Sequence, residues 1–226
     1  MRAITLSILA AAGMAAAANA EVVLSFGFTD LNGSYNSTAG QFTANADNNG
    51  LIRTGGDVTR LQSPGAGTAT YATGFFGTAP AGLMNFQLNL SVFNKANAGF
   101  GIQTADGSGS FTITDKDGST ITGTISGTWI GGIGSPGSTQ FNGLLSNVLV
   151  SSLDGTFDGL PGSFDGIFGQ QPLEGALVNL LIQPAAGFFD ADFTGVTTQT
   201  SGEITPAPGA IALLGLGGLI AGRRRR

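Results

Sequence analysis

The 226-residue chain contains no cysteine and no histidine. Without cysteine it forms no disulfide and has no thiol nucleophile, and without histidine it lacks the usual general base and the commonest zinc or copper ligand. An enzyme made from this chain would depend on carboxylates, as many glycoside hydrolases do. We therefore expect a protein that is not an enzyme, with no catalytic residue, no resident metal and no cofactor.

Basic residues are scarce between the two ends of the chain. Five of the nine lie at the termini, at Arg2 and at Arg223, Arg224, Arg225 and Arg226. The stretch 21–205 keeps four basic and fourteen acidic residues, a net charge of −10. Nucleic acids and anionic membrane surfaces bind basic patches. This charge balance excludes nucleic acid as a partner of the central region.

The first twenty residues have the pattern of a secretory signal peptide. Arg2 supplies the positive start, residues 3–18 are small or apolar apart from two hydroxyl residues, and Ala18-Asn19-Ala20 is a small-x-small cleavage site. We predict cleavage by signal peptidase after Ala20, and therefore export.

Strands are predicted through most of the region 21–205. The segments 22–28, 68–76, 83–93 and 99–104 are rich in β-branched and aromatic residues, and turn residues such as those at 30–33 separate them. In 83–93 the apolar residues occupy alternate positions: Met84, Phe86, Leu88, Leu90 and Val92. That alternation is typical of an antiparallel strand with one buried face.

The clearest hairpin is predicted at 110–130. Its turn is Asp115-Lys116-Asp117-Gly118, where Gly118 can adopt a positive φ. Phe111, Ile113, Ile121, Ile125 and Trp129 share one face, and the other face carries the hydroxyl residues Thr112, Thr114, Thr120, Thr122, Thr124, Ser126 and Thr128.

Two segments are ambiguous between strand and helix. In 140–153 the apolar residues follow a helical spacing, weakened by Gly143, and 173–182 is similar and ends before Pro184. We allow one short helix between them. The fold expected is all-β, an antiparallel sandwich or barrel, followed by a C-terminal transmembrane helix.

The acidic residues considered as ligands or catalysts are Asp154, Asp158, Asp165, Asp190 and Asp192, and each has turn-like neighbours. Calcium needs only oxygen ligands, but 115–119 has no glutamate at its end, and Asp154, Asp158 and Asp165 converge only if their loop folds back. A carbohydrate-binding module is a further alternative. Its usual stacking platform would have to come from Trp129, Tyr35 or Tyr71.

The last 21 residues, 206–226, form a three-part tail. Pro206-Ala207-Pro208 is followed by an apolar stretch, 210–222, and by four terminal arginines. A helix of thirteen residues is about 20 Å long, short for a hydrocarbon core of about 30 Å, but the arginines would hold its end at the cytoplasmic face. The segment is therefore expected to lodge only transiently in the inner membrane.

The order and spacing of this tail resemble the PEP-CTERM sorting signal of bacterial envelope proteins, although Ala207 stands where the motif has glutamate. The resemblance implies cleavage by an exosortase-like enzyme and delivery to the cell surface or the extracellular matrix. It also implies a structural or adhesive role there, with exopolysaccharide as a possible partner. The alternatives kept open are a carbohydrate-binding module and a carboxylate-dependent hydrolase.

Overall fold

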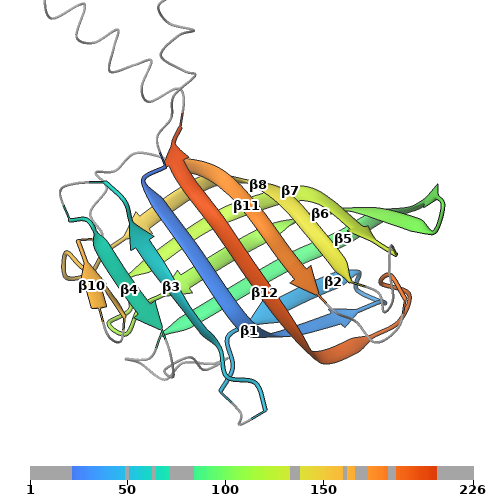
Figure 1. Cartoon of the computed structure of the whole chain (residues 1–226), viewed down its shortest axis with the longest axis horizontal. Coiled ribbons are helices and arrows are strands. Elements are labelled where there is room, and N and C mark those ends of the chain that lie inside the picture. Colours follow the sequence, from blue (N-terminus) through green and yellow to red (C-terminus); the bar gives the residue numbers. More distant parts are fainter. Residues whose placement is uncertain are drawn as a thin grey trace, which may run out of the picture.

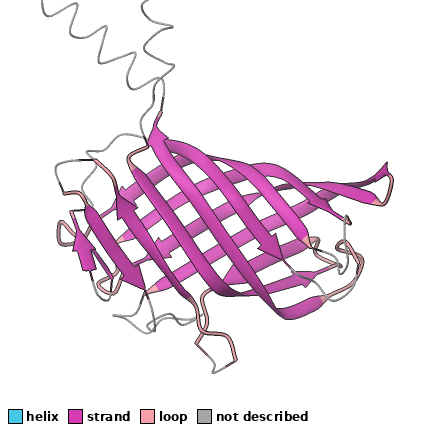
Figure 2. Ribbon diagram, viewed as in Figure 1, coloured by secondary structure: helices cyan, strands magenta, loops and turns pink. Residues whose placement is uncertain are grey.

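The computed structural model describes residues 22–48, 51–62, 65–71, 84–132, 138–159, 162–165, 173–182 and 187–207. Within these ranges every regular element is a strand (Figure 2). The strands are β1 (Leu24–Asn36), β2 (Gln41–Asn45), β3 (Gly55–Arg60), β4 (Gly67–Tyr71), β5 (Asn85–Gly99), β6 (Ile102–Thr114), β7 (Thr120–Gly131), β8 (Thr139–Ser151), β9 (Phe157–Gly159), β10 (Gly162–Phe164), β11 (Leu173–Ile182) and β12 (Phe193–Pro206). The expectation of an all-β fold is confirmed for this part of the chain.

The main sheet is antiparallel and closes on itself. Its order is β12-β11-β8-β7-β6-β5-β2-β1-β3-β4, and β12 also pairs with β1 (Figure 1). One edge of β1 pairs with β3 in its first half and with β2 in its second half. The short hairpin β9–β10 lies beside β4. Closure pairs backbone groups that an open sheet would leave exposed along its edges.

Aromatic side chains fill the interior of the closed sheet. Trp129 is fully buried, and its ring centroid lies 4.7 Å from that of Phe141, 4.9 Å from Phe189 and 5.2 Å from Phe42. A second group surrounds Phe28, whose ring lies 4.7 Å from that of Phe86. Buried aromatic rings supply much of the apolar area of a core. This chain, which has no disulfide, depends on that burial for its stability.

Both clear sequence patterns are confirmed. Met84, Phe86, Leu88, Leu90 and Val92 are all buried, while the alternate residues of β5 over the same stretch face outward apart from the buried Asn85. The predicted hairpin is β6–β7, and Gly118 in its turn has a φ of 94°. Its five apolar residues are buried, and its hydroxyl residues lie on the outer face.

The short helix allowed between 140–153 and 173–182 is wrong, because both segments are strands, β8 and β11. Each contains a β-bulge. In β8, Thr124 pairs with Ser146 whereas Thr122 pairs with Leu149, so that β8 has one extra residue there. An extra residue shifts the alternation, which places two buried residues three positions apart. Leu145 and Val148 are such a pair, and Leu177 and Leu180 are the equivalent pair in β11.

The turn predicted at 30–33 is also wrong. β1 continues through it as far as Asn36, and the local irregularity is a bulge at Asp30, whose φ is 55°. Aspartate tolerates this left-handed conformation better than most residues, which is why it resembled a turn residue in the sequence. The polar stretch that follows β1 contributes the short strands β2, β3 and β4.

Candidate functional site

Three acidic side chains meet at one end of the closed sheet. Asp117 lies in the turn between β6 and β7, Asp154 follows β8, and Asp158 belongs to β9. Each offers one carboxylate oxygen, and these oxygens lie within 4.8 Å of one another. The loop after β8 therefore does fold back toward the 115–119 turn. Of the acids considered from the sequence, Asp154 and Asp158 meet here, whereas Asp165 forms an ion pair with Arg60.

Asp115 organises the turn that carries Asp117. Its side chain is buried, and its carboxylate accepts hydrogen bonds from the backbone N–H groups of Ser119 (2.7 Å), Asp117 (3.0 Å) and Asp158 (3.1 Å). Burial raises the pKa of the Asp115 carboxyl, and the hydrogen bonds oppose that rise. The third bond ties β9 to the turn, which is how Asp158 comes to lie beside Asp117.

Lys116 supplies a positive charge to the same cluster. Its ammonium group forms ion pairs with Asp117, at 3.0 Å, and with Asp158. Hydrogen bonding to Asp158, and then to Asp117, raises the pKa of Lys116 above its usual value. Calcium takes six to eight oxygen ligands, so a calcium ion here would need ligands beyond the three carboxylates and would compete with the ammonium group. No sequence pattern singles out Lys116, because its place in the predicted turn accounts for it.

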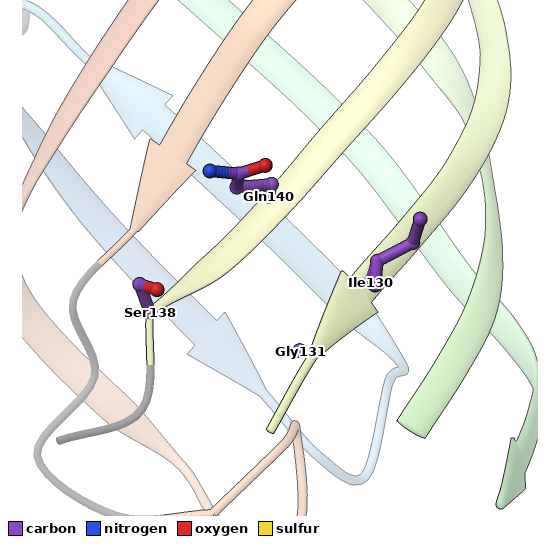
Figure 3. Close-up of a pocket in the computed structure, with 4 residues that line it drawn as sticks. All are labelled: Ile130, Gly131, Ser138 and Gln140. Atoms are coloured by element: carbon purple, nitrogen blue, oxygen red, sulfur yellow. The ribbon is translucent and has the colours of Figure 1, made fainter. Parts of the chain in front are cut away.

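A pocket of about 220 Å³ lies elsewhere, on the outer side of β7 and β8 (Figure 3). It is lined by Ile130, Gly131, Ser138 and Gln140. The amide of Gln140 and the hydroxyl of Ser138 provide hydrogen-bonding groups, and Ile130 provides an apolar surface. None of the three clustered acids lines this pocket, so the carboxylates and the pocket do not form a common cleft. Sequence reasoning missed the pocket, because its residues face one another only across paired strands.

The aromatic residues named for sugar stacking all point into the core. Trp129 and Tyr71 are fully buried, and Tyr35 is 3% exposed. Because all three rings are buried, none of them can serve as an exposed stacking platform. The most exposed aromatic side chain of the described residues is Phe100, at the tip of the β5–β6 hairpin that projects from the closed sheet (Figure 1).

The predicted processing residues fall mainly outside the described part of the chain. Ala18, Ala20, Pro208 and the four terminal arginines lie outside it, as does the predicted apolar helix 210–222. Pro206 and Ala207 are described: Pro206 is the last residue of β12, and both are half-buried. Among the described residues, none forms a helix of the length and apolar character needed to cross a bilayer.

Comparisons of this chain with protein-family models, with curated proteins and with solved structures found no match.

Proposed function

We propose that residues 21–205 form an exported, non-enzymatic domain of the bacterial cell envelope or extracellular matrix, released or transferred after processing of a C-terminal sorting signal. The observation that carries this proposal is the combination of the two chain ends: a signal peptide at 1–20 and a three-part tail at 206–226. An exosortase-like enzyme and signal peptidase are the processing partners, and contact with the inner membrane is transient.

The position of the two chain ends in the sheet supports this proposal. β1 and β12 are neighbours, with Leu24 opposite Ile204, and the N–H of Val23 donates to the carbonyl of Ile204 at 2.9 Å. The start of β1 and the end of β12 therefore lie side by side at one corner of the closed sheet (Figure 1). All described residues that close the sheet lie between the predicted signal cleavage site and Ala207, so loss of residues 1–20 and of the residues after Ala207 leaves every described strand pair in place.

The outer surface favours a structural or adhesive role over catalysis. In the middle of β5, β6 and β7 the outward residues include amides and hydroxyls, for example Asn89, Ser110 and Thr124, which lie in one row across the three strands. Such a surface is well hydrated and can form hydrogen bonds with neutral polymers.

Intact-mass measurement of the protein isolated from its host tests the proposal. We expect a mass that begins at Glu21 and lacks Arg223–Arg226. Replacing the four arginines by glutamine should leave the protein unprocessed, because the stop at the cytoplasmic face is lost. Arg53→Gln, an exposed change within the folded domain, is the matched control and should be processed normally. Mature molecules that keep Arg226 would contradict the proposal.

The pocket beside Gln140 favours a second candidate function, the binding of neutral carbohydrate. A sugar could place its apolar ring face on Ile130 and its hydroxyls against Gln140 and Ser138. Isothermal titration with exopolysaccharide from the host tests this idea. Gln140→Ala should weaken binding, while Gln87→Ala, an exposed amide on β5, should not. Equal affinities for the two variants would place any binding elsewhere.

A further inference from the structure

The last strand of the closed sheet runs directly into the predicted sorting motif. β12 ends at Pro206, the first residue of the motif, and Pro206 lies opposite Leu173 of β11. Thr205 lies opposite Glu174 in the same ladder. No spacer therefore separates the sheet from the motif.

Ile204, two residues before Pro206, is held by both neighbouring strands. Ile204 has no exposed surface, and it lies between Leu24 of β1 and Gly175 of β11. Its carbonyl accepts the hydrogen bond from Val23. Releasing the chain upstream of Pro206 would expose this side chain and separate β12 from both neighbours.

A protease needs its substrate extended and accessible on both sides of the bond that it cuts, because the cleft pairs with the substrate backbone. In this protein the backbone of residues 204–206 is already paired within the sheet. Hydrolysis or transfer at a bond before Ala207 would therefore require the end of β12 to detach first.

We propose that the folded sheet sets the upstream limit of processing: the cut falls on the carboxyl side of Ala207 or further along the tail, and the nearness of the sheet slows it. This inference rests on the proposed function, because it presumes that the tail is removed. The mature protein then keeps all of β12, including Pro206, and its sheet stays closed.

Mass spectrometry of the mature C-terminal peptide, from the full chain expressed in its host, tests the limit. We expect the last residue to be Ala207 or a later one. A mature end at Pro206 or earlier would overturn this inference alone and leave the proposed processing intact. A peptide that extends to Arg226 would overturn the proposed function and this inference with it.

A spacer tests the effect of distance. Inserting Gly-Ser-Gly-Ser between Thr205 and Pro206 moves the whole motif away from the sheet, and pulse-chase labelling then measures how quickly precursor becomes mature protein. We expect processing about fivefold faster, the factor by which one hydrogen bond of ordinary net strength changes a local opening equilibrium. The same insertion between Gly99 and Phe100, at the exposed hairpin tip, is the control and should leave the rate unchanged. Equal rates for the two insertions would overturn the effect of distance.

Discussion

Asn147 tests the explanation that a β-bulge gives β8 its helix-like spacing of apolar residues. It is the bulge residue of this strand, its side chain is exposed, and its φ is 52°. The left-handed region costs an ordinary L-residue about 1–2 kcal/mol, and asparagine is among the residues that tolerate it best. A β-branched side chain there is a steric outlier. We therefore expect Asn147→Val to lower the free energy of unfolding by about 1–2 kcal/mol.

Asn142 provides a matched control on the same strand. It is also exposed, lies opposite Thr128 in the regular ladder, and has no positive φ. Valine is favoured over asparagine in regular strands, so Asn142→Val should leave stability unchanged or raise it by up to about 1 kcal/mol. Asn147→Gly should be neutral or slightly stabilising, because glycine adopts positive φ freely. The two valine variants should therefore differ in sign.

Urea denaturation followed by the fluorescence of Trp129 measures these differences, because that indole is fully buried in the core. At this chain length, 1 kcal/mol corresponds to a shift in Tm of about 2–4 °C, so a thermal melt should separate the two valine variants clearly. If Asn147→Val and Asn142→Val unfold at the same urea concentration, the positive-φ bulge does not lie at Asn147. The spacing of Leu145 and Val148 would then need another explanation.

Three further predictions concern the core and the charged surface. Phe42→Ala should lower the free energy of unfolding in urea by about 3–5 kcal/mol, since its ring is fully buried. Phe93→Ala, at a side chain 43% exposed, should lower it by less than about 1 kcal/mol. Similar losses for the two variants would contradict the assigned core. The hydroxyl and backbone N–H of Ser37 lower the pKa of Asp192, so Ser37→Ala should raise that pKa in an NMR titration. The wild type should then be more stable than Ser37→Ala above about pH 4, an advantage lost as the pH falls through the lowered pKa of Asp192, and an unchanged pKa would refute the contact. Lys116→Met leaves three clustered carboxylates without their ammonium partner, so added Ca²⁺ should raise its Tm more than that of the wild type; equal shifts would show that Lys116 does not compete with the ion.

Alternating patterns allowed part of the fold to be predicted from the sequence. In 84–92 every second residue is apolar, and in 111–129 a positive-φ glycine separates two such runs. Burial of one face requires this alternation, so the pattern and the structure express the same constraint. Where a bulge interrupts it, as at Asn147 and Asp30, the local pattern imitates a helix or a turn, and the sequence alone led to the wrong element.

The candidate site depends on contacts that no local pattern encodes. Asp117 and Asp158 are 41 positions apart. They are brought together by the backbone hydrogen bond from Asp158 to Asp115 and by Lys116, which pairs with both acids. The sequence allowed for this convergence on the condition that the loop folds back, and Asp154 and Asp158 do meet. The third acid is Asp117 and not Asp165, which forms an ion pair with Arg60. Long-range register, unlike strand alternation, is decided by the packing of the whole sheet.

The order of strands places the pair that closes the sheet next to the predicted processing signal. The sheet cannot close until β12 pairs with both β1 and β11, and Leu24 and Ile204 are about as far apart in the chain as any paired residues. Pairings between distant segments form slowly, because the loop between them must close first. β12 ends at Pro206, so if the predicted tail lodges in the membrane, the strand that closes the sheet lies directly beside the anchored segment. Transient anchoring and completion of the fold would then be linked by the absence of any spacer between them.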